Sequence, residues 1–132
     1  MKIVRKINNE LAIAGQITLE QLPQIAQEGF KSVLNLRSPN EQGFLNSEPE
    51  KVEFLGLSYI NIPVKSEVMN DETATSLLEQ INKLSKPLLM HCDYAMRSAV
   101  IVLMYIVIWQ GATLQQAFKQ VEKFGLFRTV SD

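Results

Sequence analysis

Cys92 and Arg97 are the residues whose types and spacing best support chemistry in this chain, with four residues between them. The apolar run at residues 88–90 before the cysteine predicts a short buried strand. The strongly apolar segment that starts near Arg97 and runs to residue 110 predicts a buried helix. We therefore expect a strand-to-helix turn with a thiol at its entrance and a guanidinium at its exit.

Such a turn is suited to an anion, because ligands in open α/β sheets bind beyond the carboxyl ends of strands. The first turn of a helix there presents free N–H groups and the positive end of the helix dipole. We expect these groups and Arg97 to stabilise the thiolate of Cys92, which is the nucleophilic form of a cysteine. The planar Arg97 fork can hold two oxygens of a phosphoryl group, and Ser98 can donate to the sulfur. The expected substrate-binding residues are Asp93, Tyr94, Ala95, Met96, Arg97 and Ser98.

Two structural alternatives compete with this interpretation. Cys92 can be a small buried side chain at a strand end, beside a solvated Arg97, since cysteine is often simply buried. His91 is next to the thiol in sequence, but neighbours on a strand point to opposite faces. We therefore expect His91 to orient the turn through hydrogen bonds and not to act as a general base.

Strand and helix patterns alternate along the chain. Strands are predicted at residues 4–7, 11–14, 32–36, 57–62 and 88–90. Helices are predicted at residues 18–28, 49–55, 98–110 and 112–123, and from residue 70 or 71 to about 84. Strands separated by helices favour an α/β domain with three layers, in which helices flank a mostly parallel sheet. The first two strands form a possible antiparallel pair around the turn-like Asn8–Asn9.

Length and composition limit the function further. The 132 residues support a single domain, 1–132, and the net charge of −1 lacks the basic excess expected of a nucleic-acid-binding protein. The longest apolar run, 11 residues at 99–109, is too short to span a bilayer, so no membrane partner is expected. One cysteine excludes an internal disulfide and favours a reducing, cytoplasmic location. One histidine and one cysteine also leave little for a metal site, so no metal or cofactor is expected.

The segment MHCDYAMRS at residues 90–98 resembles the phosphate-binding loop of cysteine-dependent protein tyrosine and dual-specificity phosphatases. Residues 14–16, 28–37, 41–43 and 59–64, with NLR at 35–37 and NIPV at 61–64, extend the resemblance over most of the chain. They are similar to a bacterial phosphatase-like family that also occurs as a domain in beta-lactamase hydrolase-like proteins. The resemblance implies a phosphotyrosine-phosphatase-like three-layer fold, a cysteinyl-phosphate intermediate and no metal.

Three features depart from the usual phosphatase loop. Four residues, and not five, separate Cys92 from Arg97, a length shared by the resembled family and also similar to the loop of rhodanese-type sulfurtransferases. Ala95 stands near the place of a common loop glycine and is strained if that position needs a positive φ. Asp93 places a carboxylate beside the thiol, where it would repel phosphate if it pointed inwards. We expect Asp93 to point to solvent or to backbone amides.

The related phosphatases use an aspartate on a loop before the cysteine as general acid. Glu67, Asp71 and Glu72 are the candidates here, and the choice between Glu67 and Asp71 stays open. Asp71 is equally explained as a helix cap and Glu67 as a solvated charge. Arg37 follows a predicted strand, so it approaches the site or pairs within a loop or at the surface.

Three functions follow from these residues. The first is a metal-independent phosphatase of the tyrosine or dual-specificity type, acting on a phosphorylated protein or a small phosphate ester. The second is a rhodanese-like sulfurtransferase or persulfide carrier, which the short loop favours. The third is a silent oxyanion-binding module, which Ala95 and Asp93 favour.

Overall fold

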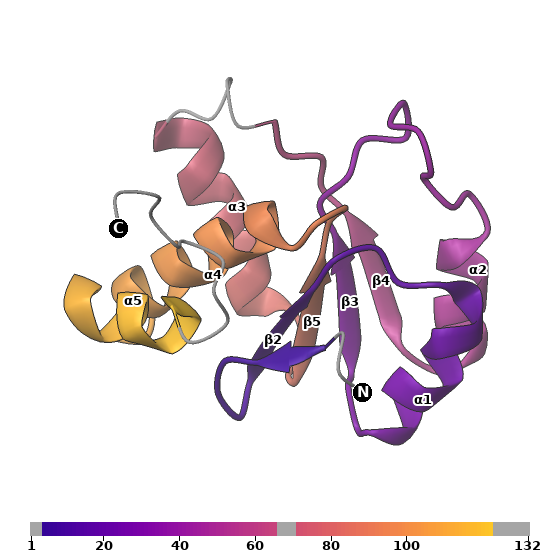
Figure 1. Cartoon of the computed structure of the whole chain (residues 1–132), viewed down its shortest axis with the longest axis horizontal. Helices are drawn as coiled ribbons and strands as arrows, with labels where there is room; N and C mark the ends of the chain where they lie inside the picture. Colours follow the sequence, from indigo (N-terminus) through magenta and orange to yellow (C-terminus); the bar gives the residue numbers. More distant parts are fainter. Residues whose placement is uncertain (1–3, 66–70, 123–132) are drawn as a thin grey trace, which may run out of the picture.

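The computed structural model describes residues 4–65 and 71–122, with residues 71 and 121 described by their backbone alone. Five strands form one sheet in the order β1-β2-β5-β3-β4 (Figure 1). Their bounds are Arg5–Lys6 for β1, Leu11–Ala14 for β2, Ser32–Asn35 for β3, Ser58–Asn61 for β4 and Leu88–His91 for β5. Strands β2, β5, β3 and β4 run parallel, and β1 pairs antiparallel with β2. The mostly parallel sheet of the sequence prediction is therefore confirmed.

Helices cover both faces of this sheet and complete three layers (Figure 1). One face carries α1 (Leu22–Gln27), which follows a 3-10 turn at Leu19–Gln21, and α2 (Glu48–Phe54). The other face carries α3 (Asp71–Lys83), α4 (Met96–Ile108) and α5 (Leu114–Glu122). All the predicted helices are present. Helix α4 begins two residues before its predicted start, and α5 begins two residues after its own predicted start.

The central strands divide their side chains between two cores, as the period of two along a strand requires. In β5, Leu88 and Met90 pack with α3 and α4, whereas Leu89 packs with α1 and α2. Strands β2, β3 and β5 are buried along their whole length, while the edge strand β4 is partly exposed. Strand β5 is therefore packed on both faces, and this packing fixes the position at which the following turn begins.

The parallel arrangement brings the carboxyl ends of four strands to one edge of the sheet. The segments that follow β2, β3, β4 and β5 all start there. Backbone bonds tie these segments together: Cys92 N donates to Ala14 O at 3.3 Å, and Leu36 N donates to His91 O at 2.9 Å. The fold thereby gathers residues from distant parts of the sequence around the turn after β5.

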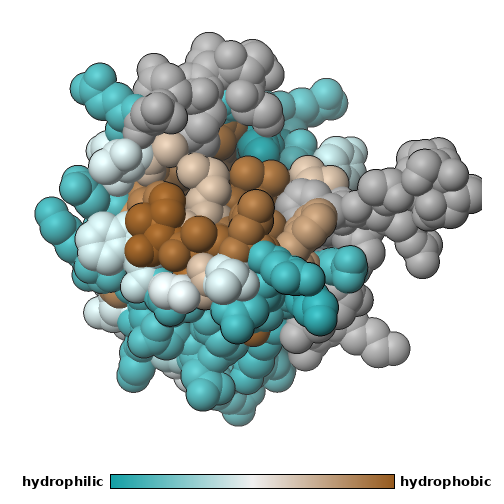
Figure 2. Space-filling model, turned by 90° about the vertical axis from the view of Figure 1, so that its left-hand side faces the viewer, coloured by the Kyte–Doolittle hydropathy of each residue, from teal (hydrophilic) through white to brown (hydrophobic). Residues whose placement is uncertain are grey.

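The layer of α4 and α5 also exposes large apolar side chains, namely Val100, Ile108, Trp109, Leu114 and Phe118. Figure 2 views this side of the molecule and shows a hydrophobic area bordered by hydrophilic residues. Ile108 ends α4, 12 residues after its first residue Met96, which is about 18 Å at 1.5 Å per residue. The end of α4 is thus far from the turn after β5. In the part of the chain that the structure describes, no helix has the length and apolar character needed to cross a membrane.

Candidate active site

Cys92 lies directly after the central strand, on the side of the sheet that α4 covers. Its side chain is fully buried and belongs to the core between the sheet and α4. Ser98, in the first turn of α4, is also fully buried, and its Oγ donates to Cys92 Sγ at 3.4 Å. The thiol therefore has a hydroxyl donor fixed by packing, at the position where the sequence places one.

The turn from Asp93 to Met96 is short and contains one unusual backbone conformation. Ala95 has a φ of 73° and caps the amino-terminal end of α4, with its carbonyl accepting from Ala99 N at 2.9 Å. The predicted strain is confirmed, because a residue with a Cβ rarely adopts this left-handed region. The Tyr94 side chain is 83% exposed and Met96 is 43% exposed. Both side chains therefore face outwards, and what they offer an anion in this conformation is backbone N–H.

The segment after β2 braces this turn. Gln16 N donates to Asp93 O at 2.9 Å. A Cβ at Gly15 would lie 2.8 Å from the same carbonyl oxygen, closer than side chains pack against backbone. The close approach of the two segments therefore requires glycine at position 15.

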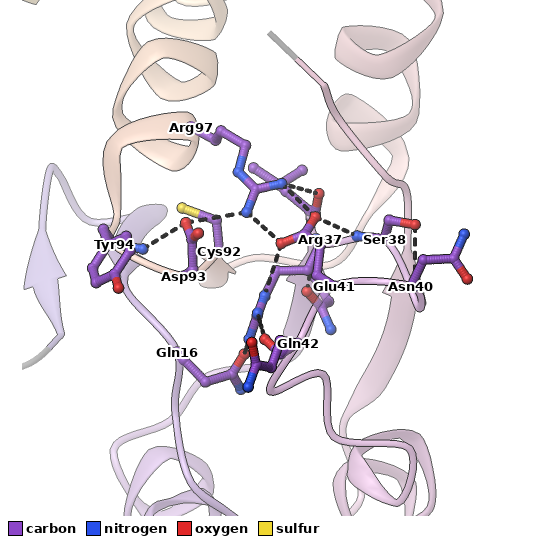
Figure 3. A network of polar contacts seen from close by, with 12 residues as sticks. Gln16, Arg37, Ser38, Asn40, Glu41, Gln42, Cys92, Asp93, Tyr94 and Arg97 are labelled. Carbon is purple, nitrogen blue, oxygen red and sulfur yellow. Dashed lines mark hydrogen bonds and ion pairs between the residues drawn. The ribbon is translucent and has the colours of Figure 1, made fainter.

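Arg97 is held along one edge of its guanidinium by Glu41, which follows β3. Arg97 Nη1 donates to Glu41 Oε2 and Arg97 Nη2 donates to Glu41 Oε1, each at 2.8 Å (Figure 3). Arg97 Nη1 also donates to Val64 O at 3.1 Å, after β4. The guanidinium thus joins the segments after three strands in a bidentate geometry, which fixes its plane as well as its position.

Glu41 is itself part of a larger network (Figure 3). It accepts from Ser38 N at 2.8 Å and from Arg37 Nε at 3.1 Å. The hydrogen bond from Arg97 is the main cause that lowers the pKa of Glu41 to about 2, against the opposing effect of burial. The hydrogen bond with Glu41 is in turn the main cause that raises the pKa of Arg97. Both groups are therefore ionised across the physiological pH range.

Arg37 is buried and pairs within the loops, the second of the two roles that the sequence left open. It contacts Gln16 Oε1 at 2.5 Å and the carbonyl of Gln42, in addition to Glu41. Arg37 supports the residue that holds Arg97.

Asp93 differs in part from the sequence expectation. Its Oδ1 accepts from Tyr94 N at 2.8 Å, as a carboxylate directed at backbone amides should. The same oxygen also lies 3.1 Å from Arg97 Nη2 (Figure 3). Burial acts to raise the pKa of Asp93, but the bonds from Arg97 and from the Tyr94 amide outweigh it and leave that pKa below its usual range. The carboxylate therefore faces the arginine and not only solvent and amides.

His91 lies on the opposite face of the sheet from Cys92, as strand alternation predicts. Its Nε2 forms a hydrogen bond with Glu48 Oε2 at 2.5 Å, and both side chains are fully buried. Glu48 is the first residue of α2. The pair therefore anchors α2 to the end of β5, one residue before the thiol.

The two candidate general acids are not placed in the site by this structure. Glu67 lies outside the described residues, and Asp71 is described only as the first residue of α3. Glu72, the third candidate, is exposed and borders a hollow between residues 62–64 and the first half of α3. Among the described residues, no group of three or more His, Cys, Asp or Glu side chains is arranged to hold a metal ion.

Sequence reasoning missed several residues of this network. Glu41 lies in one of the segments that resemble the family, but no role was predicted for it, although its spacing of four residues from Arg37 suits an ion pair. Gln16 lies in the resembling segment 14–16 but was likewise assigned no role, and Glu48 gave no signal, because an acid at the start of a helix is an ordinary surface residue. Their contacts depend on which strands become neighbours in the sheet.

Comparisons with solved structures show the same fold in cysteine-dependent phosphatases. The structure of P. aeruginosa TpbA, as a cysteine-to-serine variant in complex with phosphotyrosine, has a TM-score of 0.77 and 16% identity, and the match covers 94% of this chain and 74% of TpbA. The active form of Tk-PTP gives a TM-score of 0.76 at 19% identity, and the match covers 92% of this chain and 83% of Tk-PTP. The core catalytic domain of the S. cerevisiae PP-IP phosphatase SIW14, in complex with citrate, gives 0.76 at 17%, covering 97% and 78%.

Sequence comparisons identify closer relatives. A beta-lactamase hydrolase-like protein of Agrobacterium fabrum is 31% identical over 101 residues, covering 74% of this chain and 23% of the relative. A second, from Xylella fastidiosa, is 30% identical over 112 residues, covering 82% and 26%. The chain thus spans about a quarter of the length of these relatives. The family model described as beta-lactamase hydrolase-like protein, phosphatase-like domain, matches residues 3–108 of this chain. The resemblance found in the sequence is confirmed, and the chain belongs to this family of phosphatase-like domains.

Proposed function

We propose that this protein is a metal-independent, cysteine-dependent phosphatase that works through a cysteinyl-phosphate intermediate. The observation that carries the proposal is the turn between β5 and α4, where Cys92 with its Ser98 donor precedes an arginine fixed by Glu41. Membership of a phosphatase-like family and the fold of cysteine-dependent phosphatases support the same chemistry.

In the first step the Cys92 thiolate attacks phosphorus. An S–P bond forms, the bond between phosphorus and the leaving oxygen breaks, and that oxygen takes a proton. Arg97 and the amides of the turn hold the remaining phosphoryl oxygens, whose charge grows in the transition state. Since Glu41 fixes the guanidinium plane beforehand, no reorientation is needed at that moment.

In the second step a water molecule attacks the phosphorus of the thiophosphate. The S–P bond breaks, inorganic phosphate leaves, and the electron pair returns to Cys92 as thiolate. The Ser98 hydroxyl, at 3.4 Å from Sγ, stabilises that departing sulfur. Glu67 or Asp71 supplies the proton of the first step and accepts one from water in the second.

The substrate class is a phosphorylated protein or a small phosphate ester. TpbA was solved with phosphotyrosine, and SIW14 is a PP-IP phosphatase, so this fold serves both kinds. We expect the ring of a phosphotyrosine to pack against the Tyr94 side chain, which is exposed in the turn after Cys92, because aromatic rings pack against one another.

The test is a paired assay on one preparation of the full chain. Aryl-phosphate hydrolysis and thiosulfate-to-cyanide sulfur transfer are measured for the wild type, Cys92→Ser and Ser98→Ala. We expect aryl-phosphate hydrolysis that Cys92→Ser abolishes and that Ser98→Ala reduces about 100- to 1000-fold, the range for loss of one positioned donor. Thermal denaturation of each variant establishes that the fold is kept. Hydrolysis by Cys92→Ser at the wild-type rate, or its absence in the wild type, contradicts the proposal.

The second candidate function is sulfur transfer with Cys92 as a persulfide carrier. The spacing of four residues between Cys92 and Arg97 favours it, because this loop length is similar to that of rhodanese-type sulfurtransferases. Sulfur transfer without phosphate release, with one extra sulfur on Cys92 by mass spectrometry, would establish it. Oxyanion binding with neither activity would identify a silent binding module.

A further inference from the structure

We propose that Asp93 is a specificity-determining residue, whose carboxylate competes with the bound oxyanion and weakens the binding of dianionic ligands more than that of monoanionic ones. The inference rests on the proposed function, because it concerns the same oxyanion site. It goes further in assigning a charge dependence to ligand binding and a role to the residue next to the nucleophile.

The first step of the argument is the position of the Asp93 carboxylate. One oxygen, Oδ1, takes a hydrogen bond from the Tyr94 amide at 2.8 Å and lies 3.1 Å from Arg97 Nη2. These are one loop N–H and one guanidinium N–H, the two kinds of donor that a bound oxyanion needs. The internal carboxylate thus occupies donors of the cradle in the manner of a ligand.

The second step is the edge of Arg97 that remains for a ligand. Glu41 takes the Nη1–Nη2 edge with two bonds of 2.8 Å. A guanidinium has five N–H groups in a fixed fork, so a second bidentate partner must use the Nε–Nη2 edge. Asp93 already contacts Nη2. An oxyanion on that edge therefore has to displace the Asp93 carboxylate or bind next to it.

The third step is the balance of charge around the cradle. Arg37 and Arg97 bring two positive charges, while Glu41 and Asp93 bring two negative charges. Without Asp93 the three remaining residues would keep one net positive charge for the ligand. With Asp93 ionised, that charge is cancelled before the Cys92 thiolate is counted.

A dianion meets about twice the repulsion from Asp93 that a monoanion of the same shape meets, because Coulomb energy is proportional to charge. Asp93 therefore weakens both ligands but weakens the dianion more. The affinity ratio between two such ligands reports the effect, whereas a merely structural role of Asp93 would change both affinities together.

The experiment uses two ligands of similar shape that are not hydrolysed, benzenesulfonate as monoanion and phenylphosphonate as dianion. Their dissociation constants are measured by calorimetry, above the second ionisation of the phosphonate, for the wild type and Asp93→Asn. Asparagine keeps an acceptor for the Tyr94 amide and removes only the charge. Glu53→Gln, which removes one exposed charge on α2, is the matched control.

We expect Asp93→Asn to lower the ratio of the phenylphosphonate to the benzenesulfonate dissociation constant about tenfold, which corresponds to 1.4 kcal/mol. The control Glu53→Gln should leave that ratio within about twofold of its wild-type value, because solvent and salt screen an exposed charge. An unchanged ratio in Asp93→Asn, or weaker phenylphosphonate binding, overturns the inference about Asp93 while the oxyanion site stands. Failure of both ligands to bind either protein refutes the oxyanion site, and the proposed function with it.

Discussion

Replacing Glu41 by glutamine tests whether the arginine of the turn is held in place by charge. Glu41 accepts two bonds from Arg97, one from Arg37 and one from Ser38 N. Glutamine has nearly the same shape, but one of its two terminal atoms is a donor that faces the guanidinium. The variant therefore loses the charge and at least one of the bidentate bonds, without leaving a cavity.

The pKa of Glu41 gives the size of the effect. A fall from 4.5 to about 2 corresponds to about 3 kcal/mol, at 1.36 kcal/mol per pKa unit. The Glu41 side chain is 26% exposed, so screening by solvent reduces the contribution to about 1–2 kcal/mol. Because the folded-state pKa is depressed, this stability is present above about pH 4.5 and is lost as the pH falls towards 2.

The assay is urea denaturation of the wild type and Glu41→Gln at about pH 7 and about pH 3. We expect the variant to be about 1–2 kcal/mol less stable at neutral pH, and more than half of this difference to disappear at the lower pH. Glu53→Gln, an exposed acid on α2, should stay within about 0.5 kcal/mol of the wild type at both. A gap that does not change with pH would show that Glu41 acts through shape and not charge. Hydrolysis of an aryl phosphate by Glu41→Gln should also fall at least about tenfold, since Arg97 loses its fixed plane.

Two further predictions concern the backbone of the turn. Ala95→Gly should raise the free energy of unfolding by about 0.5–1 kcal/mol, because glycine adopts a φ of 73° without strain; Ala74→Gly, inside α3, should lower it by about 1 kcal/mol, and a loss in both would contradict the strain argument. Gly15→Ala should cost about 1–3 kcal/mol and reduce turnover, because the new Cβ would lie 2.8 Å from Asp93 O. An amide proton of Gln16 that remains as protected from exchange in this variant as in the wild type would refute it.

The fold was predictable because its signals are local. The apolar run at residues 88–90 and the strong helix that follows predicted β5 and α4, and a strand before a helix predicted a parallel sheet. The same patterns placed Cys92 at a carboxyl end of a strand and Ser98 beside it. The strain at Ala95 was expected from the resemblance, because Ala95 stands near the place of a common loop glycine and only glycine adopts a positive φ at no steric cost.

The contacts of Arg97 and His91 were not predictable from local patterns. Arg97 meets Glu41 across 56 positions of sequence, and His91 meets Glu48 across 43. Which acid meets which base depends on the order of β5, β3 and β4 in the sheet, and an isolated acid in a loop gives no sign of it. The contact of Asp93 with Arg97 was not predictable for the same reason, because Arg97 is oriented by Glu41, which is distant in sequence.

The charges of the site indicate how it distinguishes ligands. A chain with a net charge of −1 whose two site arginines are matched by two carboxylates creates little long-range attraction for an anion. These four groups therefore do not set up the field of one sign that accelerates encounter in clefts lined by like charges. What remains is short-range: backbone N–H groups of the turn and a guanidinium whose plane is fixed by Glu41. If Arg97 binds the ligand as we propose, selection depends on whether a ligand can replace Asp93 at Arg97, and that depends on its charge and on the geometry of its oxygens.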